Sequence, residues 1–199
     1  MGAPFLTRSN AASRQARAEA LAERLAGKPL VLVGMMGAGK TTVGRRVANR
    51  LGRHFFDSDE EIEKAAQMTI PDIFEQRGED EFRAGETRVI ARVLREPGIV
   101  LATGGGAFVN STTRTLVKQE AVSVWLKADL DVLFERVSRR SNRPLLKTEN
   151  PRATLEKLIA DRYPIYAEAD VTVASRDVPQ DVVANSVIDA VLTHLKSQD

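Results

Sequence analysis

The sequence predicts a three-layer α/β/α fold around a single five-stranded parallel sheet. Short apolar runs alternate along the chain with segments in which apolar residues recur at helical spacing, a pattern typical of repeated strand–helix–strand units. The runs are continuous and do not alternate with polar residues, so helices are expected to cover both faces of the sheet. With 199 residues and 43% hydrophobic content, the chain can bury one substantial core.

The strands are expected at the apolar runs. The first run reads Leu-Val-Leu-Val and is followed by a glycine-rich segment and then by a helical pattern. The order of strand, loop and helix recurs with the later runs, and we find no internal repeat or low-complexity tract. The predicted strands lie at residues 30–33, 55–56, 99–102, 122–126 and 171–173.

Helices are expected between the strands because residues that favour helix starts precede the apolar-periodic segments. These candidate starts are Asp59, Thr69, Asp129 and Asn150, the last of which stands before Pro151. The last helix is predicted at about residues 182–195, where one apolar stripe holds Val183, Val187, Val191 and Leu195.

Residues 1–28 differ in composition from the rest and are interpreted as an N-terminal extension, helical or disordered. The alanine-rich stretch at residues 11–25 favours a short docked or fraying helix. An organellar transit peptide is the alternative, since such peptides are rich in arginine and poor in acids, but Glu19 and Glu23 count against it. Residues 29–199 are then expected to form a single domain.

Composition excludes several classes of function. The 29 basic and 27 acidic residues nearly cancel, which disfavours a nucleic-acid partner. The chain has no cysteine, so disulfides, thiolate catalysis and zinc–thiolate sites are excluded, and its two histidines lack metal-ligand spacing. No apolar run approaches the roughly 20 residues of a membrane span. We expect a cytoplasmic protein with no membrane partner, and a monomer because no exposed apolar seam is evident.

The strongest motif is GMMGAGKTT at residues 34–42, which satisfies G-x-x-x-x-G-K-[ST] between a buried strand and a helix. Its glycines let backbone N–H groups and the helix N-terminus surround phosphate oxygens. Lys40 is expected to bridge the β- and γ-phosphates, and Thr41 to bind Mg²⁺ through its hydroxyl. The motif therefore predicts ATP and Mg²⁺ binding, with contacts to ATP from Gly37, Ala38, Gly39, Lys40, Thr41 and Thr42.

Two further features fall near the carboxyl ends of strands, where open α/β sheets bind ligands, and a third, Arg83, lies in a long helical region that begins near Thr69. Asp57 and Asp59 are two residues apart after the second strand, so both can face one side; alternatively, Asp59 only caps the next helix. Arg83 could bind an anionic substrate or pair with a nearby acid. Glycines 104–106 follow the third strand, and three in a row indicate a backbone that something approaches closely, unless the loop is only a hinge.

In order and spacing these motifs resemble the shikimate kinase family over residues 30–195. The resemblance rests on the P-loop and five further motifs, Asp57-Ser58-Asp59, Phe82-Arg83 with Glu86, Thr103-Gly104-Gly105-Gly106, Arg143-Pro144-Leu145-Leu146 and Arg162-Tyr163-Pro164-Ile165-Tyr166. It implies a P-loop kinase fold like that of nucleoside monophosphate kinases, with a mobile lid at about residues 138–150. It also implies ATP-dependent phosphorylation of the 3-hydroxyl of shikimate, giving shikimate 3-phosphate and ADP on the route to chorismate and aromatic amino acids.

The resemblance also implies roles for individual residues. Asp57 resembles the residue that supports Mg²⁺ through water, and Asp59 the one that holds the acceptor hydroxyls and favours deprotonation. The catalytic set would be Lys40, Asp59 and Arg143, with Arg143 as the lid arginine over the phosphates. Shikimate would be bound by Asp59, Arg83, Gly105, Gly106 and Arg162, with the two arginines on its carboxylate, while Arg176 and Pro179 would border adenine.

Departures from the family pattern are small, with Met36 where proline is frequent and Thr41 where serine is common. Two alternatives stay open on the sequence alone. One is a kinase of the same fold acting on gluconate or a nucleoside monophosphate. The other is a non-catalytic nucleotide-binding regulator, against which the joint presence of Lys40, Asp59, Arg83, Arg143 and Arg162 argues.

Overall fold

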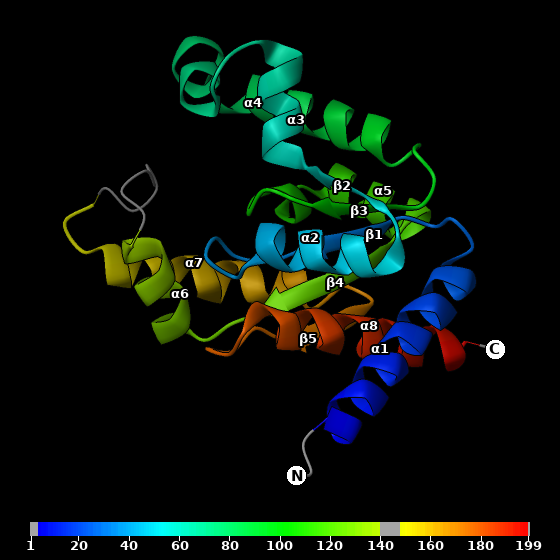
Figure 1. Ribbon diagram of the computed structural model, residues 1–199. Helices are drawn as coiled ribbons and strands as arrows, with labels where there is room; N and C mark the ends of the chain where they lie inside the picture. The colour runs from blue at the N-terminus through cyan, green and yellow to red at the C-terminus, as the bar shows by residue number, and fades with distance from the viewer. Residues whose placement is uncertain (1–3, 140–147, 199) are drawn as a thin grey trace.

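The computed structural model describes residues 4–139 and 148–198 and, within these ranges, side chains from residue 12 onward. Five parallel strands form one sheet in the order β2-β3-β1-β4-β5, which confirms the predicted sheet (Figure 1). Strands β1 (Leu30–Val33) and β3 (Ile99–Ala102) match the predicted runs. Strands β2 (His54–Asp57), β4 (Val122–Lys127) and β5 (Val171–Ala174) extend past them because ladder pairing uses the backbone and does not require an apolar side chain.

Burial follows the position of each strand in the sheet. Every residue of the central strands β1 and β3 is buried, whereas the edge strand β5 alternates between buried and exposed residues. Strand β1 pairs with β3 on one side and with β4 on the other, with Leu32 opposite Ala102 and Val33 opposite Trp125. The loops that follow β1, β2 and β3 therefore leave the same edge of the sheet.

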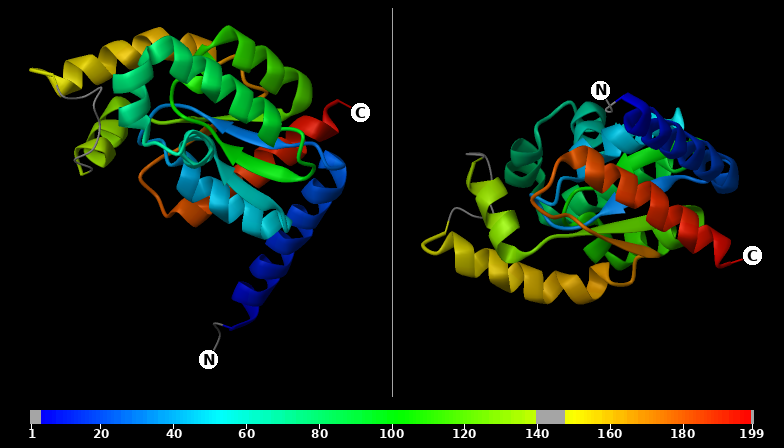
Figure 2. Two further views of the ribbon diagram at one scale, coloured as in Figure 1. Left: turned by 90° about the horizontal axis from the view of Figure 1, so that it is seen from above. Right: turned by 60° about the horizontal axis from the view of Figure 1, so that its bottom comes forward.

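Helices cover both faces of the sheet (Figure 2). One face carries α1 (Pro4–Leu25), α2 (Lys40–Leu51) and α8 (Gln180–Lys196), which contact one another. The opposite face carries α4 (Ile70–Val93), α5 (Ser111–Glu120) and α7 (Pro151–Tyr166), and the remaining elements are α3 (Ser58–Ala66), η1 (Ala107–Val109) and α6 (Leu130–Ser138). In the part of the chain that the structure describes, no helix is both long and apolar enough to cross a membrane.

Three of the four predicted helix starts are confirmed. Thr69 caps α4 by accepting a hydrogen bond from the Asp72 backbone N–H, and Asn150 caps α7 in the same way. Asp129 precedes α6 but makes no capping bond with its side chain. The prediction for Asp59 was wrong, because α3 begins at Ser58 and Asp57 is the cap: its Oδ1 accepts from the Asp59 backbone N–H at 3.1 Å.

Helix α4 is bent at Gly78, which has φ 79° and ψ 175° inside an otherwise helical segment. Glycine populates positive φ about as readily as negative φ, whereas a side chain there would add strain. The bend separates the start of α4 from its second half, which carries Arg83 and Glu86. The direction of that second half is therefore set by one residue.

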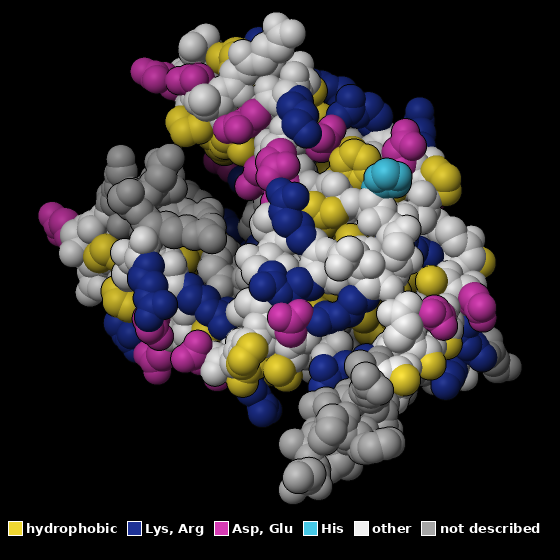
Figure 3. Space-filling view, viewed as in Figure 1, with side chains coloured by type: hydrophobic (Ala, Val, Ile, Leu, Met, Phe, Trp, Pro, Cys, Tyr) yellow, Lys and Arg dark blue, Asp and Glu magenta, His cyan; other side chains and the backbone are white. Residues whose placement is uncertain are grey.

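The space-filling view shows basic side chains over α2 (Figure 3). They are paired with acids from other elements: Arg45 lies 2.7 Å from Glu60, and Arg50 lies 2.6 Å from Asp181. Arg46 approaches the same Asp181 at 3.5 Å. The local surplus of positive charge on this face is therefore small.

The N-terminal segment forms a long helix that packs on the last one. Ala18, Leu21 and Leu25 of α1 are buried in the main core, and α1 contacts α8 and α2. Arg17 and Asp189 form an ion pair between α1 and α8 at 3.2 Å. The second half of α1 is therefore part of the folded body and not a free appendage.

We expect Leu21→Ala to lower the free energy of unfolding by about 2–5 kcal/mol, because it removes a fully buried side chain from the α1–α8 contact. Urea unfolding would measure the change. Glu23→Ala, an exposed site one half-turn away on the same helix, serves as the control and should have little effect. Equal stability of the two variants would show that α1 does not contribute to the core.

Candidate active site

The P-loop has the backbone conformation that its glycines allow. Gly34 has φ 135°, and a Cβ there would lie 2.8 Å from the Leu126 carbonyl oxygen. Gly39 has φ 89° and is the N-cap of α2. Side chains would obstruct or strain both positions, so the loop turns tightly from β1 into α2 and leaves N–H groups at the helix N-terminus available to an anion.

Lys40 is folded back over this loop. Its side chain is buried, and Nζ donates to the carbonyl oxygens of Gly34 at 2.8 Å and Met35 at 2.9 Å. These acceptors hold the ammonium group at the surface that the P-loop would present to phosphates. Lys40 therefore lies on the P-loop, while its contact with the β- and γ-phosphates stays a prediction.

Thr41 and Asp57 meet at the start of α2. The Thr41 hydroxyl donates to Asp57 Oδ2 at 2.7 Å, and Asp57 stands at the end of β2. Within the described residues, no cluster of three or more acidic or histidine side chains could hold a metal ion by itself. A hydroxyl and a carboxylate oxygen are nevertheless suitable ligands for Mg²⁺, which keeps several waters and binds substrate phosphates as well.

The two aspartates and the P-loop line one cavity of about 430 Å³. Of the predicted site residues, eight line it: Gly37, Gly39, Lys40, Thr41, Thr42, Asp57, Asp59 and Gly105. Ala38 is fully buried beneath the loop. Arg83, Gly106, Arg162 and Arg176 do not line this cavity, and Arg143 lies outside the described residues.

Side chains converge on the glycine loop at residues 104–106, which explains its composition. A Cβ on Gly104 would lie 2.7 Å from Asp59 Oδ1, and one on Gly106 would lie 2.6 Å from Arg83 Nη1. Arg162 Nη1 donates to the Gly105 carbonyl oxygen at 3.3 Å. The loop is therefore a surface that these side chains approach closely, as the sequence predicts, and not a hinge.

Arg83 pairs with two acids of its own helix, α4. Its Nη1 donates to Glu86 Oε2 at 2.7 Å, and Nη2 reaches Glu79 Oε1 at 3.4 Å. The Glu86 side chain is only 1% exposed. Burial raises the pKa of Glu86, while the hydrogen bond and charge of Arg83 oppose that rise. Arg83 therefore pairs with acids, which was one of the two alternatives, and it also lies against the glycine loop. Its binding of an anionic substrate stays a prediction.

Tyr166 is a residue whose part in the site the sequence analysis missed. Its buried hydroxyl donates to the carbonyl oxygen of Gly105, the same atom that accepts from Arg162. Burial raises the pKa of Tyr166 to about 12, more than the charge of Arg162 lowers it. Tyr166 thus fixes the middle of the glycine loop. In the sequence, Tyr166 stands near apolar residues at the end of a helix, and packing in the core explains that pattern as well as a part in the site does.

Arg136 was also missed. This α6 side chain lines the cavity and joins the P-loop to the segment after β5. It donates to Ser175 Oγ at 3.1 Å and to the Arg176 carbonyl oxygen at 2.8 Å, while Ser175 Oγ donates to the Ala38 carbonyl oxygen at 2.8 Å. In the sequence, Arg136 is one of several arginines near the end of a helix, and nothing in its spacing sets it apart.

The comparisons with known proteins decide the family. The model of the shikimate kinase family matches residues 36–192. The chain belongs to the shikimate kinase family. A shikimate kinase of Rhizobium leguminosarum bv. trifolii is 55% identical over 192 residues, which are 96% of this chain and 95% of that protein. A shikimate kinase of Rhodopseudomonas palustris is 53% identical over 93% of this chain and 91% of its own length.

Solved structures agree on the fold. Shikimate kinase from Acinetobacter baumannii in complex with shikimate matches with a TM-score of 0.80 and 42% identity, covering 83% of this chain and 93% of that one. Shikimate kinase from Aquifex aeolicus matches with a TM-score of 0.71 and 30% identity, over 85% and 97%. A gluconokinase from Sinorhizobium meliloti, at TM-score 0.58 and 18% identity over 87% and 98%, shares the fold alone. Family membership confirms a kinase of the P-loop type that uses ATP as phosphate donor.

The raised pKa of the buried Tyr166 hydroxyl predicts how the stability of the fold depends on pH. Because its folded-state pKa of about 12 lies above the ordinary value of 10.0, the folded protein keeps this proton at a pH where the unfolded chain loses it. The stability contribution is complete below about pH 10 and falls above it, by up to about 1.4 kcal/mol per pH unit. Urea unfolding at about pH 9 and pH 11 should show a smaller loss in Tyr166→Phe than in the unaltered protein. The same loss in both would contradict a buried, protonated tyrosine.

Proposed function

We propose that this chain transfers the γ-phosphoryl group of MgATP to the 3-hydroxyl of shikimate, in the synthesis of aromatic amino acids, through the residues grouped around the P-loop and glycines 104–106. The observation that carries the proposal is that Asp59, Arg83 and Arg162 meet on the glycine loop, beside the P-loop cavity. A carboxylated, hydroxylated ring placed there would find arginines for the carboxylate and a carboxylate for its hydroxyls.

On the nucleotide side, the P-loop N–H groups and the α2 N-terminus bind phosphate oxygens. Lys40 exchanges its contacts with Gly34 and Met35 for the β- and γ-phosphates. Thr41 would hold Mg²⁺ through its hydroxyl and Asp57 through water, and Mg²⁺ would supply neutralisation of the phosphate charge. Arg176 and Pro179 border the adenine, with Arg136 holding the segment at Arg176 against the P-loop.

On the acceptor side, Arg83 and Arg162 bind the shikimate carboxylate, and the backbone of Gly105 and Gly106 contacts the ring. Asp59 accepts a hydrogen bond from the 3-hydroxyl and favours its deprotonation as the phosphoryl group arrives. Phosphoryl transfer requires mainly positioning and charge neutralisation from the protein. Arg143, the predicted lid arginine, would add positive charge over the phosphates.

The proposed compartment and oligomeric state of the enzyme rest on its composition and surface. A chain without cysteine suits a reducing cytoplasm. Among the described residues, the large apolar side chains that are exposed are Phe74, Val178 and Val182. So few exposed apolar groups support a monomer, since an obligate dimer interface is large and hydrophobic.

The direct test is ADP release from MgATP with shikimate, beside gluconate and AMP as acceptors and an acceptor-free blank. We expect turnover with shikimate alone. Lys40→Ala supplies the matched background, because it should retain the fold and lose nearly all turnover. Turnover with gluconate or AMP that equals or exceeds that with shikimate would overturn the proposed acceptor.

Arg83→Ala should raise the KM for shikimate about 10- to 100-fold, since a charge-assisted hydrogen bond contributes about 1.5–3 kcal/mol. The KM for ATP should change little, because Arg83 lies on the acceptor side. Arg83→Lys keeps a charge beside buried Glu86 but loses the planar fork, so an intermediate KM is expected. Arg95→Ala, an exposed site just after α4, is the control.

Steady-state kinetics with each substrate varied would measure these effects. Equal increases in both KM values for Arg83→Ala would contradict its assignment to the acceptor. Circular dichroism of each variant separates loss of binding from loss of fold.

A further inference from the structure

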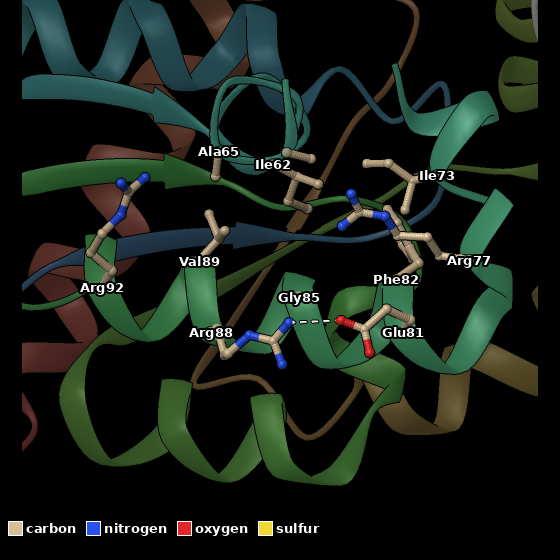
Figure 4. A pocket seen from close by; sticks show the side chains of 11 residues that line it. Ile62, Ala65, Ile73, Arg77, Glu81, Phe82, Gly85, Arg88, Val89 and Arg92 are labelled. Carbon is tan, nitrogen blue, oxygen red and sulfur yellow. Dashed lines mark hydrogen bonds and ion pairs between the residues drawn. The ribbon is translucent and has the colours of Figure 1, made fainter. Parts of the chain in front are cut away.

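A second cavity, of about 320 Å³, lies between helices α3 and α4 (Figure 4). Among the described residues, none lines both this cavity and the one at the P-loop. We refer to it as the α3–α4 cavity. Its size falls in the range of small-molecule sites, which begins at about 300 Å³.

The α3–α4 cavity and the acceptor site lie on different faces of α4. Glu81, Gly85, Arg88 and Arg92 line the cavity at helical spacing, so they share one face of the helix. Arg83 and Glu86, two and five residues after Glu81, fall on the other side, where they meet the glycine loop. The cavity is therefore not an extension of the acceptor site, although the same helix borders both.

Apolar side chains make the inner wall of the cavity. Ile62 of α3 and Ile73, Phe82 and Val89 of α4 are buried and point into it (Figure 4). Gly85 leaves the space between them open: a Cβ there would meet nothing closer than Arg88 Nη2 at 3.8 Å, an ordinary contact distance. The helix would tolerate a side chain at this position, and that side chain would occupy the space that glycine leaves open.

Arginines surround this apolar wall. Arg77, Arg88 and Arg92 line the cavity with Glu81 as the acid among them. Arg88 pairs with Glu81 at 3.1 Å as a solvent-exposed contact of small net strength. Arg92 pairs at 3.0 Å with Glu61, whose side chain is 13% exposed. Arg77 makes no hydrogen bond or ion pair within the described residues, and its guanidinium extends toward Phe82 and Ile73 (Figure 4). The cavity therefore combines an apolar wall with an excess of positive charge.

We propose that the α3–α4 cavity is a second binding site, for a small planar molecule with an apolar ring and one carboxylate. The ring would contact Ile62, Phe82 and Val89, and the carboxylate would pair with Arg77, whose planar fork suits it. Occupation changes the affinity for shikimate, because α3 carries Asp59 in its first turn and α4 carries Arg83. This second part rests on the proposed function, whereas binding itself does not.

Naphthalene-2-carboxylate is a suitable probe, titrated calorimetrically into the full chain saturated with shikimate and MgADP. Saturation prevents the carboxylated probe from entering the acceptor site. We expect binding under these conditions and at least tenfold weaker binding of the neutral naphthalene-2-carboxamide, which cannot form the charge-assisted pair. A probe Kd that rises in proportion to shikimate concentration without a plateau would overturn the proposal, because it would place the probe in the acceptor site, whereas coupling between two sites reaches a limit.

Two variants locate the site. Gly85→Leu fills the cavity and should abolish binding, and Arg77→Gln, at an exposed position, should weaken it about tenfold. Arg95→Gln removes the same charge outside the cavity and should bind like the unaltered protein. Circular dichroism confirms that Gly85→Leu is folded. Unchanged binding in both Gly85→Leu and Arg77→Gln would overturn the site.

The effect on catalysis is read separately from shikimate KM, measured with and without the probe at fixed MgATP. We expect at least a twofold change in the unaltered protein and none in Gly85→Leu. Binding that leaves this KM unchanged would overturn the coupling to the acceptor site. A chain without turnover on shikimate would overturn the proposed function, while the calorimetric result with the variants would still decide the binding site.

Discussion

The acceptor side of the site depends on the absence of side chains at residues 104–106. A Cβ on Gly104 would collide with Asp59, and a Cβ on Gly106 would collide with Arg83. Arg162 donates a hydrogen bond to the carbonyl oxygen of Gly105. These residues come from α3, α4 and α7, so the loop is where side chains of three helices meet. Glycine loses the most conformational entropy on folding. That cost is offset by the hydrogen bonds that hold the loop, from the Gly104 N–H to Ser58 Oγ at 2.8 Å and from the Tyr166 hydroxyl to the Gly105 carbonyl.

The sheet brings this loop to the P-loop. Thr103, directly after β3, donates from both its backbone N–H and its hydroxyl to the Leu32 carbonyl oxygen of β1, at 3.1 and 3.0 Å. Because β1 and β3 are parallel neighbours, their carboxyl ends emerge together, and the phosphate-binding and glycine loops are adjacent. Two loops separated by about seventy residues thus form one site through backbone pairing. Asp57, at the end of β2, is joined to the start of α2 through Thr41.

The features that could be predicted from the sequence are those with one physical explanation. The P-loop requires its glycines, the buried strands require continuous apolar runs, and the glycine triplet is costly without a close contact. The rest depends on choices that a sequence leaves open. Either Asp57 or Asp59 could cap α3, and in the structure the cap is Asp57, the last residue of β2. Arg136 and Tyr166 were missed because an arginine near a helix end and a tyrosine among apolar residues are more often surface and core residues. The role of Arg143 stays a prediction.

The contact between α1 and α8 has a consequence for how the chain is made. Arg17 and Asp189 are 172 residues apart, and α8 is one of the two helices, with α2, on which α1 packs. During synthesis α1 is therefore made long before α8, the partner that helps to bury Leu21 and Leu25. Contacts of such long sequence separation slow folding and leave intermediates with exposed apolar surface. A nascent chain arrested before α8 would thus leave the apolar stripe of α1 partly exposed to association with other chains.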